Sequence, residues 1–145
     1  MNSIKIKPFN QLSLTELYAI LKLRVDIFVV EQNCPYPELD GEDEKALHLF
    51  IKEAGEIASY LRIIINQPKT RIGRVITHKD YRGKKLSSKL MEEAMRYIAI
   101  HYPDKAITLS AQEHLQHFYA QFGFVSISDM YLEDGIPHVD MKYKM

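Results

Sequence analysis

The pattern of apolar and polar positions at the start of the chain predicts a short strand followed by a long helix. Residues 4–9 alternate weakly between apolar and polar side chains, as an edge strand does. Ser13 and Glu16 have the spacing of a capping box, which marks a helix N-terminus. Apolar residues then recur at helical spacing, namely Leu14, Leu17, Tyr18, Leu21, Val25 and Phe28. We expect this helix to end near Glu31, and we expect a loop over residues 33–43, which hold two prolines, a glycine and several carboxylates.

Strand-like segments follow the loop. Gly55 separates the first two of them, which should therefore form a hairpin, and Asn66-Gln67-Pro68 predicts a turn before the third. Residues 84–101 carry one apolar stripe at helical spacing, and Pro103 should end that helix. The three strands are expected over residues 46–52, 57–65 and 70–77.

The last third of the chain predicts a short helix between strands. After a strand over residues 106–110, Ser110 and Glu113 form a second capping-box pair. They predict a helix over residues 111–122, with Gly123 as its C-cap. Two closing strands flank a turn at Glu133-Asp134-Gly135 and are expected over residues 124–127 and 138–143.

Together these elements predict an α/β fold in a single domain over residues 1–145. Helices interleaved with strands favour a central sheet flanked by helices. The three consecutive strands should pair antiparallel, so the sheet should be mixed and mostly antiparallel, with six to seven twisted strands.

Composition excludes several classes of protein. The chain has 145 residues, a length typical of one domain. Lys plus Arg and Asp plus Glu are 19 each, which argues against a strongly basic nucleic-acid binder. The single cysteine, Cys34, cannot form an internal disulfide, which argues against a small secreted disulfide scaffold and fits a reducing compartment. The N-terminus lacks the apolar run of a signal peptide, and no stretch is long enough to span a bilayer; we expect a cytoplasmic protein.

The charge, although balanced overall, is sorted into two patches. Residues 69–89 hold eight Lys or Arg and one Asp, a net charge of +7, whereas residues 38–44 hold five carboxylates. In the basic patch a strand ends in a short loop, and Arg82-Gly83-Lys84-Lys85 then opens a helix. The unpaired N–H groups and the dipole of a helix start make a phosphate seat. A solvated basic helix start is the alternative interpretation.

Four stretches of the sequence resemble the GCN5-related N-acetyltransferases, the GNAT superfamily. Residues 77–90 are similar to its motif A, written R/Q-x-x-G-x-G/A, and Phe118-Tyr119 with Gly123-Phe124 is similar to its motif B. Residues 28–36 and 133–138 resemble the ElaA-like branch of the superfamily. The resemblance covers residues 12 to 141. The chain departs from motif A at both glycine positions, where it has Lys85 and Ser87.

The resemblance implies acetyl transfer from acetyl-CoA to a primary amine, directly within a ternary complex. It implies that the backbone of Val75, Ile76 and Thr77 binds the pantetheine arm and the thioester. It assigns the pyrophosphate to the helix start, which comprises Arg82, Gly83, Lys84, Lys85, Leu86, Ser87 and Ser88. Gln112 takes the place of an Asn that contacts the cofactor in the family. No metal is expected, and the missing glycines could weaken the affinity for CoA.

The chemistry needs a proton for the departing CoA thiolate and a base for the amine. The resemblance assigns the general acid to Tyr119, although a tyrosine there could also be an amphipathic core residue. Glu31 and His138 are candidate bases, and each could instead be structural. The carboxylates of residues 38–44 could attract a protonated acceptor, such as a polyamine, an amino sugar, a lysine side chain or a peptide N-terminus; a solvated, mobile loop is the alternative.

Other functions fit the sequence less well. A non-catalytic acyl-CoA-binding or protein-interaction module on the same fold is the main alternative, because a fold does not prove activity. His114 and His117 lack a third metal ligand in sequence. The basic patch has one aromatic residue, so nucleic-acid stacking is not expected. Cys34 lacks a histidine partner and is assigned no catalytic role. Many members of the superfamily pair as dimers, which leaves a homodimer open, but no stretch of this chain identifies an interface.

Overall fold

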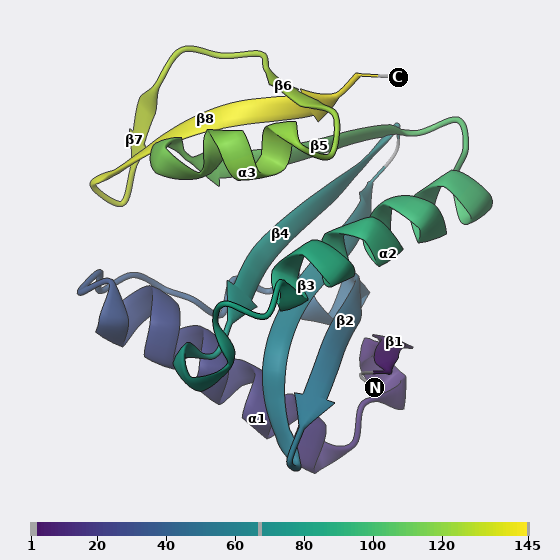
Figure 1. The fold of residues 1–145 in the computed structure, drawn as a ribbon, viewed down its shortest axis with the longest axis vertical. Helices are drawn as coiled ribbons and strands as arrows, with labels where there is room; N and C mark the ends of the chain where they lie inside the picture. Colours follow the sequence, from purple (N-terminus) through teal and green to yellow (C-terminus); the bar gives the residue numbers. More distant parts are fainter. Residues whose placement is uncertain (1–2, 67, 145) are drawn as a thin grey trace.

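The computed structural model describes residues 3–66 and 68–144. The predicted turn at Asn66-Gln67-Pro68 contains Gln67, which lies outside the described residues. The elements, shown in Figure 1, run in the order β1 (Ile4–Pro8), α1 (Leu14–Arg24), η2 (Val25–Glu31), β2 (Ala46–Glu53), β3 (Glu56–Asn66), β4 (Lys69–Thr77), α2 (Leu86–His101), β5 (Ala106–Gln112), α3 (Gln116–Ala120), β6 (Phe124–Ser126), β7 (Tyr131–Glu133) and β8 (Ile136–Tyr143). Short 3₁₀ turns lie at Phe9–Gln11, Asp43–Lys45, Lys79–Tyr81 and Glu113–Leu115.

All strands belong to one mixed sheet with the order β1-β2-β3-β4-β5-β8-β6, and β7 also pairs with β8. Every pairing is antiparallel except that of β4 with β5, which α2 connects. These two parallel strands pair at their first residues, from Lys69 with Ala106 to Arg71 with Thr108. Beyond that point they diverge, and Figure 1 shows the sheet open into a V. The predicted α/β class and mostly antiparallel sheet are confirmed.

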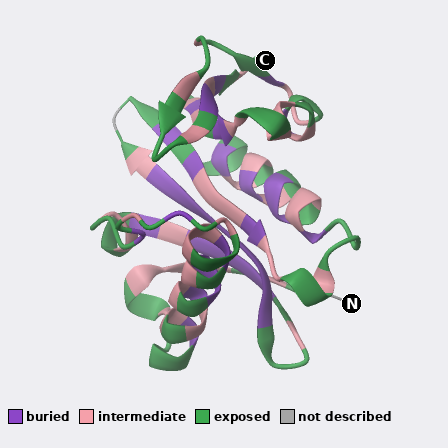
Figure 2. Cartoon of the chain, turned by 90° about the vertical axis from the view of Figure 1, so that its left-hand side faces the viewer, coloured by how far each residue is buried: buried purple, intermediate pink, exposed green. Residues whose placement is uncertain are grey.

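Helices cover both faces of the sheet. On one face the apolar stripe of α2 packs on β2, β3 and β4, in a cluster that includes Leu90, Ala94 and Ile98. On the other face Ile20 of α1 and Ile27 of η2 join a smaller cluster. The central strands are buried along most of their length, as Figure 2 shows. Burial of each such side chain contributes about 1.5–3 kcal/mol, so packing on both faces holds the sheet in place.

The first helix starts where the sequence predicts and changes character before its end. The capping box is confirmed: Ser13 Oγ accepts a hydrogen bond from the Glu16 N–H at 3.0 Å, and Glu16 Oε1 accepts one from the Ser13 N–H at 2.9 Å. From Val25 to Glu31 the helix is a π-helix. Wider turns of this kind often occur at functional sites.

The second capping box is wrong. Ser110 lies within β5 opposite Asp140, because pairing with β8 extends that strand to Gln112. The helix expected over residues 111–122 is therefore shortened to α3. Likewise α2 begins two residues later than expected, after Lys85. The strand β7 adds one pairing that the sequence pattern does not predict, and the sheet has eight strands.

Within the described ranges, no helix has the length and apolar composition needed to cross a membrane.

Candidate functional site

A cavity of about 860 Å³ opens where β4 and β5 separate. Thirteen of the fourteen site residues predicted from the sequence line it, although they come from six separate segments of the chain. They are Glu31, Val75, Ile76, Thr77, Arg82, Gly83, Lys85, Leu86, Ser87, Ser88, Gln112, Tyr119 and His138. Lys84 is not part of the lining; its ammonium group lies over the Tyr81 ring, 5.4 Å from the centroid.

The edge of β4 faces this cavity because a β-bulge interrupts its pairing with β3. Tyr60 lies opposite Ile76 and Arg62 lies opposite Gly73, so two residues of β4 face one residue of β3 between them. A bulge leaves the extra residue unpaired, and Arg74 has a positive φ of 54° there. Since β5 has already diverged, backbone groups on that side of β4 are available to a ligand.

The start of α2 provides an anion seat beside this edge. Lys85 is the N-cap and adopts the left-handed conformation, with φ 60° and ψ 31°, and no side chain caps the helix. Gly83 also has a positive φ, of 87°. The first N–H groups of a 16-residue helix therefore lie next to the cations Arg82 and Lys85 at the cavity wall. Lysine replaces glycine in the sequence here but keeps the backbone conformation that glycine favours.

Arg82 ties the helix start to the end of the first helical segment. Its Nε donates to the Thr77 carbonyl oxygen at 3.1 Å, and its Nη2 donates to Glu31 Oε1 at 3.0 Å. Both charged side chains are nearly half exposed. Glu31, predicted as a candidate base, therefore lies at the α2 end of the cavity and pairs with a cation.

A chain of hydroxyl groups links Ser87, which replaces the second glycine of motif A, to strands β4 and β3. Ser87 Oγ lies 2.6 Å from Thr77 Oγ1, which lies 3.0 Å from Ser59 Oγ. Ser59 donates to the Ile76 carbonyl oxygen at 2.9 Å, so Thr77 donates to Ser59 and Ser87 donates to Thr77. Ser59 was not predicted from the sequence, where its signal is a single polar residue within an apolar strand pattern.

Tyr119 lies deep in the cavity wall and is 7% exposed. Its ring makes an edge contact with Phe118, with centroids 5.0 Å apart. Burial raises the pKa of Tyr119 above its usual value, because the phenolate would lose its hydration. The hydroxyl group therefore stays protonated at neutral and mildly alkaline pH.

His138 lies on β8 and pairs in register with Gln112 of β5, so it lies on the opposite side of the V from β4. Its Nδ1 lies 2.7 Å from the Ile136 carbonyl oxygen, which can only accept, so Nδ1 carries the proton. In the neutral ring Nε2 is then a free acceptor, 3.8 Å from Glu133 Oε2. The Gln112 amide donates to Gln32 Oε1 at 3.1 Å and so links the two sides of the cavity.

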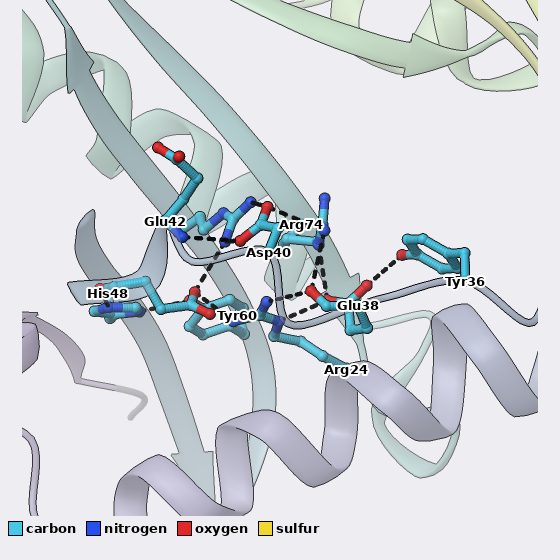
Figure 3. Close-up of polar contacts among 10 residues, drawn as sticks. Arg24, Tyr36, Glu38, Asp40, Glu42, His48, Tyr60 and Arg74 are labelled. Carbon is cyan, nitrogen blue, oxygen red and sulfur yellow. Dashed lines mark hydrogen bonds and ion pairs between the residues drawn. The ribbon is translucent and has the colours of Figure 1, made fainter. Parts of the chain in front are cut away.

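Three of the five carboxylates of the acidic segment, those of Glu38, Asp40 and Asp43, pair with arginine side chains. Glu38 Oε2 accepts hydrogen bonds from Arg24 Nε and Arg74 Nε, each at 2.7 Å. Asp43 Oδ1 accepts from Arg24 Nη1 at 2.6 Å and from Arg62 Nη1 at 2.9 Å, and Arg62 also bonds Asp40. Figure 3 shows these groups converging between α1, the loop and the strands. The formal charges of the three arginines and of Glu38, Asp40 and Asp43 cancel.

This cluster revises the interpretation of the acidic loop as solvated and mobile, whereas attraction of a protonated acceptor stays a prediction. Burial disfavours ionisation of Asp40, but the hydrogen bond and charge of Arg62 outweigh it, and the pKa of Asp40 lies well below its usual value. Arg24 also lowers the pKa of Asp43 against the effect of burial. The loop is therefore anchored by arginines through Glu38, Asp40 and Asp43. A signal existed in the sequence, because Arg24 and Arg62 interrupt apolar helix and strand patterns.

Two further observations concern metal binding and the single cysteine. Within residues 3–66 and 68–144, no group of three or more His, Cys, Asp or Glu side chains is arranged to hold a metal ion. The thiol of Cys34 is buried and donates to the Asp134 carbonyl oxygen at 3.3 Å.

Comparisons with known proteins agree with this geometry. A model of the acetyltransferase (GNAT) domain matches residues 25–145. ElaA of Escherichia coli is 42% identical over 137 residues, an alignment that covers 91% of this chain and 90% of ElaA. A UPF0039 protein of Schizosaccharomyces pombe is 44% identical over 142 residues, an alignment that covers 96% of this chain and 95% of that protein. Among solved structures, an acyl-CoA N-acyltransferase from Pseudomonas aeruginosa is 40% identical with a TM-score of 0.94, covering 99% of this chain and all of that one. This chain is thus an ElaA homologue and belongs to the GNAT acetyltransferase family.

Proposed function

We propose that this protein transfers an acetyl group from acetyl-CoA to a primary amine by direct transfer in a ternary complex. The observation that carries the proposal is one cavity that joins a bulged strand edge, an uncapped helix start with two cations, and a buried tyrosine. These are the three features needed to bind a long amide-containing arm, to bind a pyrophosphate and to protonate a thiolate.

The donor site comprises the strand edge and the helix start. Backbone groups of residues 75–77 bond the amides of the pantetheine arm and the thioester carbonyl, much as a neighbouring strand would. The N–H groups at the start of α2 bond the pyrophosphate, and Arg82 and Lys85 add positive charge. Arg82 is already oriented by Thr77, which lowers the entropic cost of binding the phosphates.

The transfer needs one proton removed from the amine and one proton given to the CoA thiolate. The amine nitrogen forms a bond to the thioester carbon, and the carbon–sulfur bond breaks with its electron pair on sulfur. His138 Nε2 takes the proton from the attacking amine, and the Tyr119 hydroxyl gives a proton to the thiolate. Because burial favours the neutral form of Tyr119, it remains a donor through the usual assay range. The two residues then exchange one proton through solvent, and no net proton is consumed.

Geometry favours His138 over Glu31 as the base. The histidine has a free ring nitrogen at the cavity, whereas the Glu31 carboxylate accepts a hydrogen bond from Arg82 at the helix start. We expect His138→Ala to lose the acidic limb of the pH profile of kcat/KM, because that limb reports the base of the free enzyme. Glu31→Gln should keep that limb. The opposite result would assign the base to Glu31.

The first test is thermal unfolding with acetyl-CoA or CoA, and with NAD as the control ligand. A ligand at 100 times its Kd stabilises by about 2.7 kcal/mol, a rise of several degrees in Tm for this size of domain. An amine screen that detects free thiol then tests turnover. Absence of any shift with millimolar acetyl-CoA would refute the donor site. Binding without turnover across amines would instead support an acyl-CoA-binding module.

The role of Tyr119 has its own test. We expect Tyr119→Phe to lower kcat by about 10²-fold or more while the Kd for CoA stays within about two-fold, since the proton is needed in the transition state. Tyr97→Phe is the matched control, because Tyr97 lies on α2 outside the cavity lining. Full turnover by Tyr119→Phe would exclude it as the general acid.

A further inference from the structure

Arg71 is a charged residue at the closed end of the cavity, where β4 and β5 still pair. It is exposed, and its Cα partners are Ile64 on β3 and Thr108 on β5. The ion pairs formed within the described ranges use the neighbouring Arg62 and Arg74 but not Arg71. Its guanidinium therefore presents an uncompensated positive charge to the cavity.

The sheet register puts Arg71 on the same face as the candidate base. Residues in register share a face, and so do residues two apart on one strand. Arg71 is in register with Thr108, and Gln112, four residues further along β5, is in register with His138. Those four residues span about 13 Å of strand. The cavity thus has a cation at one end of this face and His138 with Glu133 at the other.

Open space lies between these two ends. Gly73 is two residues after Arg71 on the same face, and a Cβ added there would meet no atom within 4 Å. Gly73 therefore contributes no side chain at this point of the cavity, which leaves room for a ligand group. The acidic loop adds no free negative charge on this side, because Asp40 is paired with both Arg62 and Arg74.

We propose that Arg71 is an anion subsite that binds a carboxylate carried by the amine acceptor. This inference rests on the proposed function and refines it: the acceptor is an amino acid or peptide-like compound in which several bonds separate the reacting amine from the carboxylate. The guanidinium fork matches a carboxylate with two parallel hydrogen bonds. The separation follows from the strand, since Arg71 precedes Val75, where the donor segment begins, by four residues. This distance is at most about 13 Å, because the bulge at Arg74 shortens the segment.

The test compares matched acceptors that differ in charge and in length. Wild-type protein with saturating acetyl-CoA is assayed with 6-aminohexanoate and its amide, and with glycine and glycinamide. We expect a preference for 6-aminohexanoate over its amide of about 10- to 100-fold in kcat/KM, the range for hydrogen bonds to a charged group. Glycine should show no such preference, because a single carbon separates its amine from its carboxylate, so the carboxylate cannot approach Arg71 while the amine attacks the thioester.

Variants then assign the preference to Arg71. Arg71→Gln should remove it through a higher KM for 6-aminohexanoate, with the amide and the Kd for acetyl-CoA unchanged, and Arg71→Lys should restore part of it. Arg96→Gln is the control, because Arg96 is exposed on α2, outside the cavity lining, and pairs with Glu93. Equilibrium binding of the same four acceptors in the presence of CoA gives a readout that does not depend on turnover.

Two outcomes would overturn the inference separately. If acetyl-CoA binds and the amide is acetylated, but the acid and the amide bind equally in wild type and in Arg71→Gln, the subsite is refuted and the proposed function stands. If acetyl-CoA does not bind at all, the proposed function fails and the acceptor subsite fails with it.

Discussion

Lys85 lies where motif A has a glycine, and substitutions there test the proposed pyrophosphate site directly. Its backbone is left-handed, with φ 60° and ψ 31°. A residue with a Cβ in that conformation costs about 1–2 kcal/mol. Glycine removes the cost but loses about 0.5–1 kcal/mol through the greater freedom of the unfolded chain. We therefore expect Lys85→Gly to be more stable than wild type by about 0.5 kcal/mol, whereas Lys85→Ala keeps the strain and gains nothing.

The same pair of variants separates charge from backbone geometry in cofactor binding. If the lysine ammonium group contributes about 1 kcal/mol to phosphate binding, both variants should raise the Kd for CoA about five-fold. High salt should shrink the difference between wild type and either variant, because salt screens an exposed charge. If close backbone approach limits binding instead, Lys85→Gly alone should bind CoA more tightly than wild type.

Thermal unfolding and isothermal titration with CoA at low and high salt measure both effects. A gain of about 0.5 kcal/mol corresponds to a Tm about 1–3 °C higher for Lys85→Gly. The reasoning about backbone strain is refuted if Lys85→Gly melts below Lys85→Ala. The reasoning about charge is refuted if both variants bind CoA as wild type does at low salt.

Three further predictions concern stability. The hydrogen bond from the Ser13 N–H lowers the pKa of Glu16 to about 2, against the effect of burial. Its stabilisation is therefore full above pH 4.5 and is lost as the pH falls through about 2. Urea unfolding should show Glu16→Gln less stable than wild type by about 1–2 kcal/mol at pH 7, with the difference shrinking steadily as the pH falls toward the folded pKa. Arg24→Met should lower the free energy of unfolding, measured in urea at pH 7, by about 3–5 kcal/mol. Arg24 is fully buried, and its loss leaves the buried Glu38 carboxylate with one cation fewer. A change near zero would show that the cluster does not stabilise the fold. Gly123→Ala should lower the free energy of unfolding by about 1–3 kcal/mol, because φ is +95° and the new Cβ would lie 2.7 Å from the Tyr143 ring; an unchanged Tm would contradict this.

The sequence alone was sufficient for elements set by neighbours along the chain. The Ser13–Glu16 capping box needs groups three residues apart, and the α2 stripe needs only helical spacing. The proposed cofactor segments are local in the same sense, since a strand, a turn and a helix start follow one another from Val75 to Ser88. Their common position in one cavity could therefore be anticipated from the motif resemblance.

Only the tertiary structure decided which groups neutralise one another. Glu38 meets arginines from α1 and β4, 14 and 36 residues away in sequence. Ser110 became a strand residue because β8 pairs with it, which outweighed a local capping signal. Likewise, only the structure shows that Arg62 and Arg74 pair with carboxylates while Arg71 forms no ion pair within the described residues. Local propensity depends on adjacent residues, but charge pairing and strand pairing depend on distances that folding alone sets.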